Sequence, residues 1–121
     1  VKDTGLLVTM LGFDMVQEIL SGNLKIYKGA IYENIIAEIF SKNEKLLYYY
    51  GKNNRLEIDF IINYNQKPTL VEVKSAENTK AKSVSTLLKN NVVEYAIKLS
   101  KNNIFENGNI LNLPLYMSIY L

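Results

Sequence analysis

The alternation of apolar and polar positions predicts helices in the first third of the chain. Residues 4–11 (TGLLVTML) and 14–20 (DMVQEIL) have the pattern of two short helices broken by Gly12 and Gly22. Residues 28–41 (KGAIYENIIAEIFS) form the clearest helix, because their apolar positions cover about half of the helical wheel. That helix should bury one broad face.

Strand-like segments dominate the rest of the chain. Two segments are exceptions. The pattern of residues 82–90 predicts a helix, and Pro114 is well placed to open a terminal helix. The predicted strands are 46–50, which ends at Gly51, the two arms of a hairpin within 56–75, then 92–100 and 109–113. This order predicts an α/β domain with a mixed central β-sheet flanked by helices, in two or three layers.

Three charged residues interrupt the predicted hairpin at positions where a core strand would carry Val or Ile. They are Asp59 on the first arm and Glu72 and Lys74 on the second. Because side chains alternate across a strand, Ile58 and Phe60 should share one face of the first arm, and Asp59 should lie on the other.

A turn centred on residues 65–66 predicts a register in which Asp59 lies directly across from Glu72, and Glu57 across from Lys74. Like charges directly opposed destabilise a ladder. Two neighbouring, partly buried carboxylates therefore either share a proton or hold a cation. The alternative interpretation is a solvated outer face with a Glu57–Lys74 ion pair. Glu33, at the margin of the apolar arc of its helix, is a candidate to join the acidic pair.

The amino-acid composition limits which catalytic groups and metal ligands the chain can supply. The chain has no Cys and no His, which excludes cysteine nucleophiles, histidine bases and zinc sites built from these residues. A bound metal would need oxygen ligands, which favours Mg²⁺, Mn²⁺ or Ca²⁺. The net charge of +2 permits a nucleic-acid partner, and Arg55 is the single Arg among fourteen basic residues. Base reading by bidentate arginines is therefore not expected.

The sequence predicts one domain over residues 1–121, with a helical lead-in over 1–22 and a core over 25–121. No apolar run approaches the ~20 residues of a membrane span, and we expect no signal peptide. With the lack of Cys, this favours a cytoplasmic protein without a membrane partner. Because the chain begins at Val1 rather than Met, we expect a piece of a longer protein.

Five separated motifs carry a family resemblance. They are DTGL (Asp3–Leu6), G-x-x-x-E (Gly29–Glu33), E-I-D-F-I (Glu57–Ile61), E-V-K-S (Glu72–Ser75) and Pro-x-Tyr (Pro114–Tyr116). In these motifs the chain resembles the C-terminal domain of unknown function of many prokaryotic AAA-type ATPases. Within them, the series Glu33, Asp59 and Glu72-Val73-Lys74 resembles the PD-(D/E)xK nuclease superfamily. Ile58 stands where that superfamily usually has Pro.

The resemblance implies a restriction-endonuclease-like core and a metal-dependent nuclease that hydrolyses DNA phosphodiesters with Mg²⁺ or Mn²⁺. It implies Glu33, Asp59, Glu72 and Lys74 as catalytic residues. The implied metal ligands are Asp59, Glu72, the Val73 carbonyl and, through water, Glu33. Lys80 and Lys82 follow the motif closely and are weaker candidates for phosphate contacts, because a solvated turn explains them as well.

The resemblance also implies a P-loop ATPase module upstream in the same polypeptide. The chain itself contains no G-x-x-x-x-G-K-[ST] loop, so we expect no ATP hydrolysis from it. The alternative function is a catalytically inactive nuclease-fold module with a binding or regulatory role, which docks to the ATPase or to a partner. A homo-oligomer is compatible with either function. Tyr48, Tyr49 and Tyr50 fit either a strand or a base-stacking surface, and a strand role is the commoner one.

Overall fold

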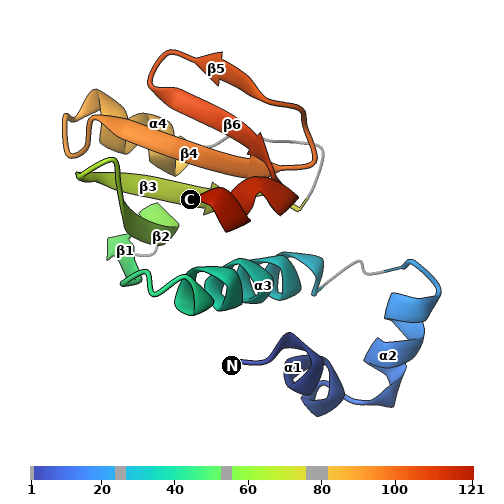
Figure 1. Ribbon diagram of the computed structural model, residues 1–121. Helices are drawn as coiled ribbons and strands as arrows, with labels where there is room; N and C mark the ends of the chain where they lie inside the picture. The colour runs from blue at the N-terminus through green and yellow to red at the C-terminus, as the bar shows by residue number, and fades with distance from the viewer. Residues whose placement is uncertain (1, 24–26, 53–55, 76–81) are drawn as a thin grey trace.

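The computed structural model describes residues 2–23, 27–52, 56–75 and 82–121. In these residues one six-stranded mixed sheet has helices on both faces (Figure 1). The helices are α1 (Thr4–Met10), α2 (Phe13–Leu20), α3 (Lys28–Lys42), α4 (Lys82–Lys89) and the 3₁₀ helix η1 (Leu115–Tyr120). The strands are β1 (Tyr48–Lys52), β2 (Leu56–Tyr64), β3 (Lys67–Val73), β4 (Tyr95–Ser100), β5 (Phe105–Asn107) and β6 (Ile110–Pro114).

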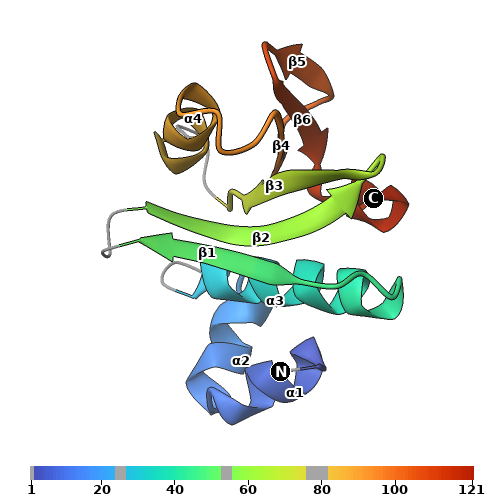
Figure 2. The same ribbon diagram turned by 90° about the vertical axis from the view of Figure 1, so that its left-hand side faces the viewer.

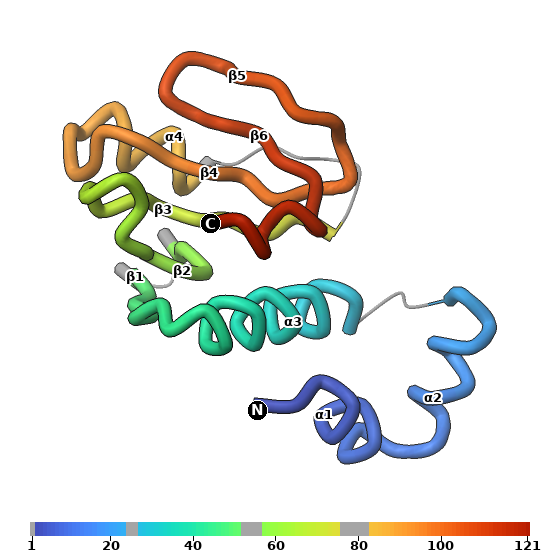
Figure 3. The backbone as a smooth tube through the Cα atoms, in the orientation of Figure 1, coloured from blue at the N-terminus to red at the C-terminus, as the bar shows by residue number. Residues whose placement is uncertain are grey.

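The sheet has the strand order β1-β2-β3-β4-β6-β5. Strands β1, β2 and β3 form an antiparallel meander, whereas β3, β4 and β6 run parallel to one another. The chain reaches β4 through α4 and then makes the β5–β6 hairpin at the far edge (Figure 3). The prediction of a mixed α/β domain with flanking helices is thus confirmed.

Predicted and observed elements differ mainly at their ends. The strand predicted over 92–100 begins only at Tyr95, because Asn91 adopts a positive φ of 52° in the preceding turn. Pro114 ends β6 and caps η1 rather than opening the helix. β5 was not predicted, since its three exposed residues carry no apolar alternation, and Gly108 at φ 58° turns the chain into β6.

Two apolar cores lie on opposite faces of the sheet (Figure 2). On one face, Ile36 and Phe40 of α3 pack against strand residues that include Val71, Ile97 and Leu99. The Phe40 and Phe60 rings meet edge to face, with centroids 5.7 Å apart. The second core is built from Val84 and Leu87 of α4 with Ile58, Leu70 and Ala96. The sheet is therefore covered on both sides, which selects three layers from the two alternatives that the sequence left open.

β2 carries a bulge that the sequence did not reveal. Tyr48 pairs with Ile61 and Tyr50 with Ile58, so two β2 residues, Asp59 and Phe60, lie opposite the single residue Tyr49. An extra residue shifts the alternation of side chains along a strand. Ile58 consequently packs on the α4 face and Phe60 on the α3 face. The prediction that these two residues share a face is wrong for this reason.

The predicted hairpin register is confirmed from Phe60–Val71 to Tyr64–Lys67. Asn65 and Gln66 form the turn, with φ of 50° and 63°. Positive φ at both central residues is the conformation that two-residue hairpins require, because it matches the twist of the strands.

The helices α1 and α2 lie beyond α3, on its side away from the sheet (Figure 2). A polar clamp holds α1. Thr4 donates to Glu38 Oε2 from its backbone N (3.1 Å) and its Oγ1 (2.9 Å), and Asn34 donates to Thr4 Oγ1 (3.0 Å). Lys42 Nζ pairs with Glu38 Oε1 at 2.6 Å. None of the described helices has both the length and the apolar character needed to cross a bilayer.

Acid should release α1 from α3. The hydrogen bond from Lys42, followed by those from Thr4, lowers the pKa of Glu38 to about 2. A carboxyl whose pKa falls on folding contributes docking energy above its ordinary pKa of 4.5, and that energy is lost as the pH falls towards 2. We expect amide protection factors in α1, measured by NMR, to drop over this interval while those of the sheet persist.

The matched variant is Glu38→Gln, which should lower α1 protection already at neutral pH, whereas Glu44→Gln, on an exposed residue, should not. Unchanged α1 protection in Glu38→Gln would show that the clamp does not hold the helix.

Candidate functional site

β2 and β3 separate where the charged residues lie. Their last described pair is Phe60–Val71. Beyond this pair, the Val73 backbone N donates its hydrogen bond to a side chain instead of to the backbone of β2. The acceptor is Asp59 Oδ2, at 2.7 Å. Asp59 and Glu72 are therefore not the directly opposed pair that an unbulged hairpin predicted. We call the opening between the strands, bounded by Asp59, Glu72, Val73 and Lys74, the fork.

The backbone of Val73 faces the fork. The next residue, Lys74, donates its backbone N–H to the Leu99 carbonyl of β4 at 2.8 Å. Backbone groups of successive strand residues point to opposite edges, and the N–H and C=O of one residue point to the same edge. The Val73 carbonyl is therefore directed to the same side as its N–H, which Asp59 accepts. This is the position that the resemblance implied for a carbonyl ligand.

Glu72 has one satisfied and one unsatisfied oxygen. The residue is only 5% exposed, and its Oε1 pairs with Lys74 Nζ. Its Oε2 is buried and has no hydrogen-bond partner among the described residues. An unpaired buried carboxylate oxygen is costly, so this atom marks a place where a proton or a cation would bind. The Glu57–Lys74 pair of the alternative interpretation is not formed, since Lys74 pairs with Glu72 and Glu57 is exposed.

Glu33 on α3 lies close enough to the fork for Asp59 and Lys74 to influence its pKa. A Cβ placed on Gly29 would lie 3.8 Å from Ser75 Oγ and 3.9 Å from Glu33 Oε1. The first turns of α3 therefore lie against the end of β3. The charge of Asp59 raises the pKa of Glu33, and that of Lys74 lowers it. Two of the four predicted catalytic residues, Asp59 and Glu72, thus lie on β2 and β3. Lys74 directly follows β3, and Glu33 lies on α3.

Burial governs the electrostatics of the fork. Loss of solvent is the largest influence on the pKa of Asp59, Glu72 and Glu33, and it raises all three. The hydrogen bond from Val73 N–H partly opposes this rise at Asp59, and the bond from Lys74 does so at Glu72. Asp59 adds a further upward shift to the pKa of Glu33. These carboxylates are therefore poised to take up positive charge.

Sequence reasoning missed two buried polar residues beside the fork. Lys98 on β4 pairs in register with Glu72, and Asn112 on β6 pairs with Lys98, so the three lie in a row across the sheet. Lys98 is 8% exposed and Asn112 is 2% exposed. Burial lowers the pKa of Lys98, while Glu72 opposes that shift. Both residues interrupt apolar strands, which is the same signal that singled out Asp59 and Glu72.

Other predicted residues fall outside this arrangement. Lys80 lies outside the described residues, as does the side chain of Lys82 at the start of α4. Across the part of the chain that the structure describes, no group of three or more acidic side chains is arranged to hold a metal ion. A cation in the fork would therefore depend on two carboxylates together with the Val73 carbonyl and water.

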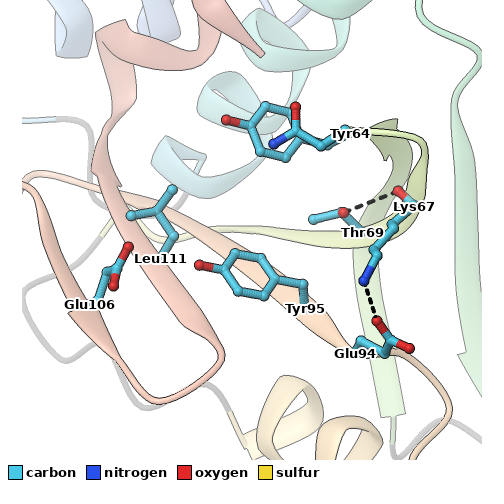
Figure 4. Close-up of a pocket in the computed structure, with 8 residues that line it drawn as sticks. Tyr64, Lys67, Thr69, Glu94, Tyr95, Glu106 and Leu111 are labelled. Carbon is cyan, nitrogen blue, oxygen red and sulfur yellow. Dashed lines mark hydrogen bonds and ion pairs between the residues drawn. The ribbon is translucent and has the colours of Figure 1, made fainter.

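A separate cavity of about 400 Å³ lies at the hairpin end of the sheet (Figure 4). Its wall includes the ion pair between Lys67 Nζ and Glu94 Oε2 at 2.6 Å. The Tyr64 and Tyr95 side chains and Leu111 also line it. None of the sequence-predicted site residues borders this cavity, so it is separate from the fork.

Comparison with known proteins assigns the sequence to a family. No curated protein and no solved structure matches the chain significantly. One family model matches residues 28–116, which run from the first residue of α3 into η1 and include the whole fork. The helices α1 and α2 precede the matched region. The match covers well over half of the chain, and the protein belongs to the family described as Domain of unknown function (DUF4143).

Proposed function

We propose that the fork binds Mg²⁺ or Mn²⁺ and that the domain hydrolyses DNA phosphodiesters on a restriction-endonuclease-like core. The observation that carries the proposal is the buried Oε2 of Glu72, which has no hydrogen-bond partner among the described residues. Glu72 shares the fork with a second, partly buried carboxylate, Asp59. A divalent cation is the ligand that would satisfy this oxygen and relieve the repulsion between two acids.

Each side chain has a role in this chemistry. Asp59 and Glu72 would hold the ion, with the Val73 carbonyl as a further oxygen ligand. The ion would supply charge neutralisation at the scissile phosphate and acidify a bound water. Lys74, 28% exposed at its side chain, is placed to orient the attacking water or to stabilise developing negative charge. Glu33 would accept a hydrogen bond from a metal-bound water rather than bind directly.

A second candidate function is an inactive nuclease-fold module that docks to a partner, for which we propose the upstream ATPase implied by the family resemblance. Its specific support is that the described acidic residues form no cluster of three around one point. The low net charge of +2 also provides little electrostatic attraction for the phosphates of a DNA duplex.

Calorimetric titration with Mn²⁺, followed by incubation with supercoiled plasmid, separates the two functions. We expect saturable Mn²⁺ binding that Glu72→Gln weakens at least tenfold, whereas the exposed neighbour Glu57→Gln changes it little. Binding together with plasmid nicking supports the nuclease. Binding without nicking favours the docking module, and the absence of Mn²⁺ binding would overturn the metal site altogether.

Mn²⁺ affinity should fall as the solution is acidified. Because burial raises the pKa of both Asp59 and Glu72, protons compete with the metal at a higher pH than for exposed carboxylates. We expect the apparent Kd to increase as the pH is lowered from 8 through the raised pKa values, with proton release on binding. Titrations in buffers of different ionisation enthalpy report that release. A Kd that stays constant down to the ordinary carboxylate pKa would contradict the buried site.

A further inference from the structure

The two helices that precede the matched family region form an arm, residues 2–23. Several of the large apolar side chains of this arm are exposed to solvent. α1 has no buried residue, and α2 buries only Met15. The hydrogen bonds described between α1 and α3 all involve Thr4, in the polar clamp on Glu38. The large apolar side chains left exposed are Leu6 (55%), Met10 (70%), Leu11 (40%), Phe13 (75%) and Leu20 (82%).

Each of these side chains belongs to α1, α2 or the link between them. Met10, Leu11 and Phe13 surround Gly12, where α1 passes into α2. Phe13 and Leu20 are seven residues apart, which places them on the same face of α2. Scattered exposed apolar residues need no explanation, but a contiguous patch usually marks a surface that another molecule covers.

Charge distinguishes the possible occupants. The arm contains Lys2 against Asp3, Asp14 and Glu18, a net charge of −2, whereas the whole chain carries +2. Asp14 and Glu18 are four residues apart, so they form an acidic edge on the side of α2 next to its exposed face. Within the described part of the chain, neither forms an ion pair. Two arms packed against each other would bring these acids together, which disfavours a second copy as the occupant.

We propose that the arm is a docking surface for an amphipathic helix of a partner protein, one whose apolar stripe is flanked by Lys or Arg. The apolar stripe would cover Phe13, Leu20 and Met10, and the basic flank would pair with Asp14 and Glu18. In Figure 2, α3 separates α1 and α2 from β2 and β3, the strands that carry Asp59 and Glu72. We therefore treat this interaction as independent of the proposed metal chemistry.

The test uses the full chain and two synthetic helical peptides with the same Leu and Phe stripe. One peptide carries Lys on its flanks and the other carries Glu. By fluorescence anisotropy, we expect the Lys peptide to bind at least tenfold more tightly. The double variant Phe13→Ser/Leu20→Ser should abolish binding. Ile104→Ser, which changes another exposed apolar residue (55%) that is not part of the arm, should preserve it.

The variant Asp14→Asn/Glu18→Gln should remove the preference for the Lys peptide while keeping residual binding. All substituted residues are exposed, and circular dichroism checks that the fold is retained. Equal affinity for the two peptides would overturn the proposal, as would binding that survives Phe13→Ser/Leu20→Ser. A wild-type dimer in light scattering that this double variant converts to a monomer would instead assign the arm to a second copy of the chain.

Discussion

Asp59→Asn should abolish Mn²⁺-dependent plasmid cleavage and leave the fold at least as stable as the wild type. Removing the charge of a principal metal ligand should cost at least ~100-fold in rate, comparable to the loss of a strong electrostatic contact to the transition state. Initial rates of nicking, measured at saturating Mn²⁺, report this loss.

The expected gain or constancy in stability follows from the direction of the pKa shift. Burial raises the pKa of Asp59, so at neutral pH the ionised carboxylate opposes folding. Asn removes that charge and still offers an oxygen to accept the 2.7 Å hydrogen bond from Val73 N. Asp59→Ala, in contrast, leaves this N–H unsatisfied and should cost about 1–3 kcal/mol.

The two variants together separate a functional carboxylate from a structural one. If Asp59 only stabilises the fork, Asp59→Asn should be clearly less stable than the wild type in urea unfolding. If nicking persists at the wild-type rate in Asp59→Asn, the nuclease proposal is overturned. Glu57→Gln, two residues away on the same strand and exposed, should change neither property.

Phe40→Ala should produce the largest loss of stability. Phe40 is fully buried, and its ring packs edge to face on Phe60 in the core between α3 and the sheet. Truncating a buried Phe removes apolar surface and leaves a cavity, which costs about 3–5 kcal/mol. Since small domains are stable by only ~5–15 kcal/mol, a large fraction of the variant should unfold at modest urea concentrations.

Urea unfolding followed by far-ultraviolet circular dichroism measures this loss. Phe40→Leu retains most of the apolar surface and should lose less. Leu46→Ala, at a side chain that is 74% exposed, should stay within about 0.5 kcal/mol of the wild type. A Phe40→Ala loss no larger than that of Leu46→Ala would show that α3 is not packed on the sheet as described, and Glu33 would then have no fixed place beside the fork.

Much of the fold was predictable because local signals agree with the tertiary structure. The apolar period of residues 28–41 predicted α3, which spans Lys28–Lys42, and the turn at 65–66 predicted the β2–β3 register. In both, the pattern that packs the core is also the pattern that the local backbone prefers. The exposed three-residue β5 has no such pattern, because pairing with β6 alone defines it.

The candidate site was predictable as a set of residues but not as a geometry. Charges within apolar strands singled out Asp59, Glu72 and Lys74, and the same signal was present at Lys98 and was overlooked. The sequence did not reveal that β2 bulges opposite Tyr49. A bulge depends on how neighbouring strands twist and pack, which no local pattern records.

By itself, the amino-acid sequence determined which segments become helices and strands, how the hairpin pairs, and which oxygens are available for chemistry. Only the tertiary structure decided that Asp59 accepts a hydrogen bond from Val73 rather than facing Glu72, and that one oxygen of Glu72 is buried without a partner among the described residues. The physical reason is that periodicity is a property of neighbouring residues, whereas burial and strand separation arise from segments that meet only when the sheet is assembled.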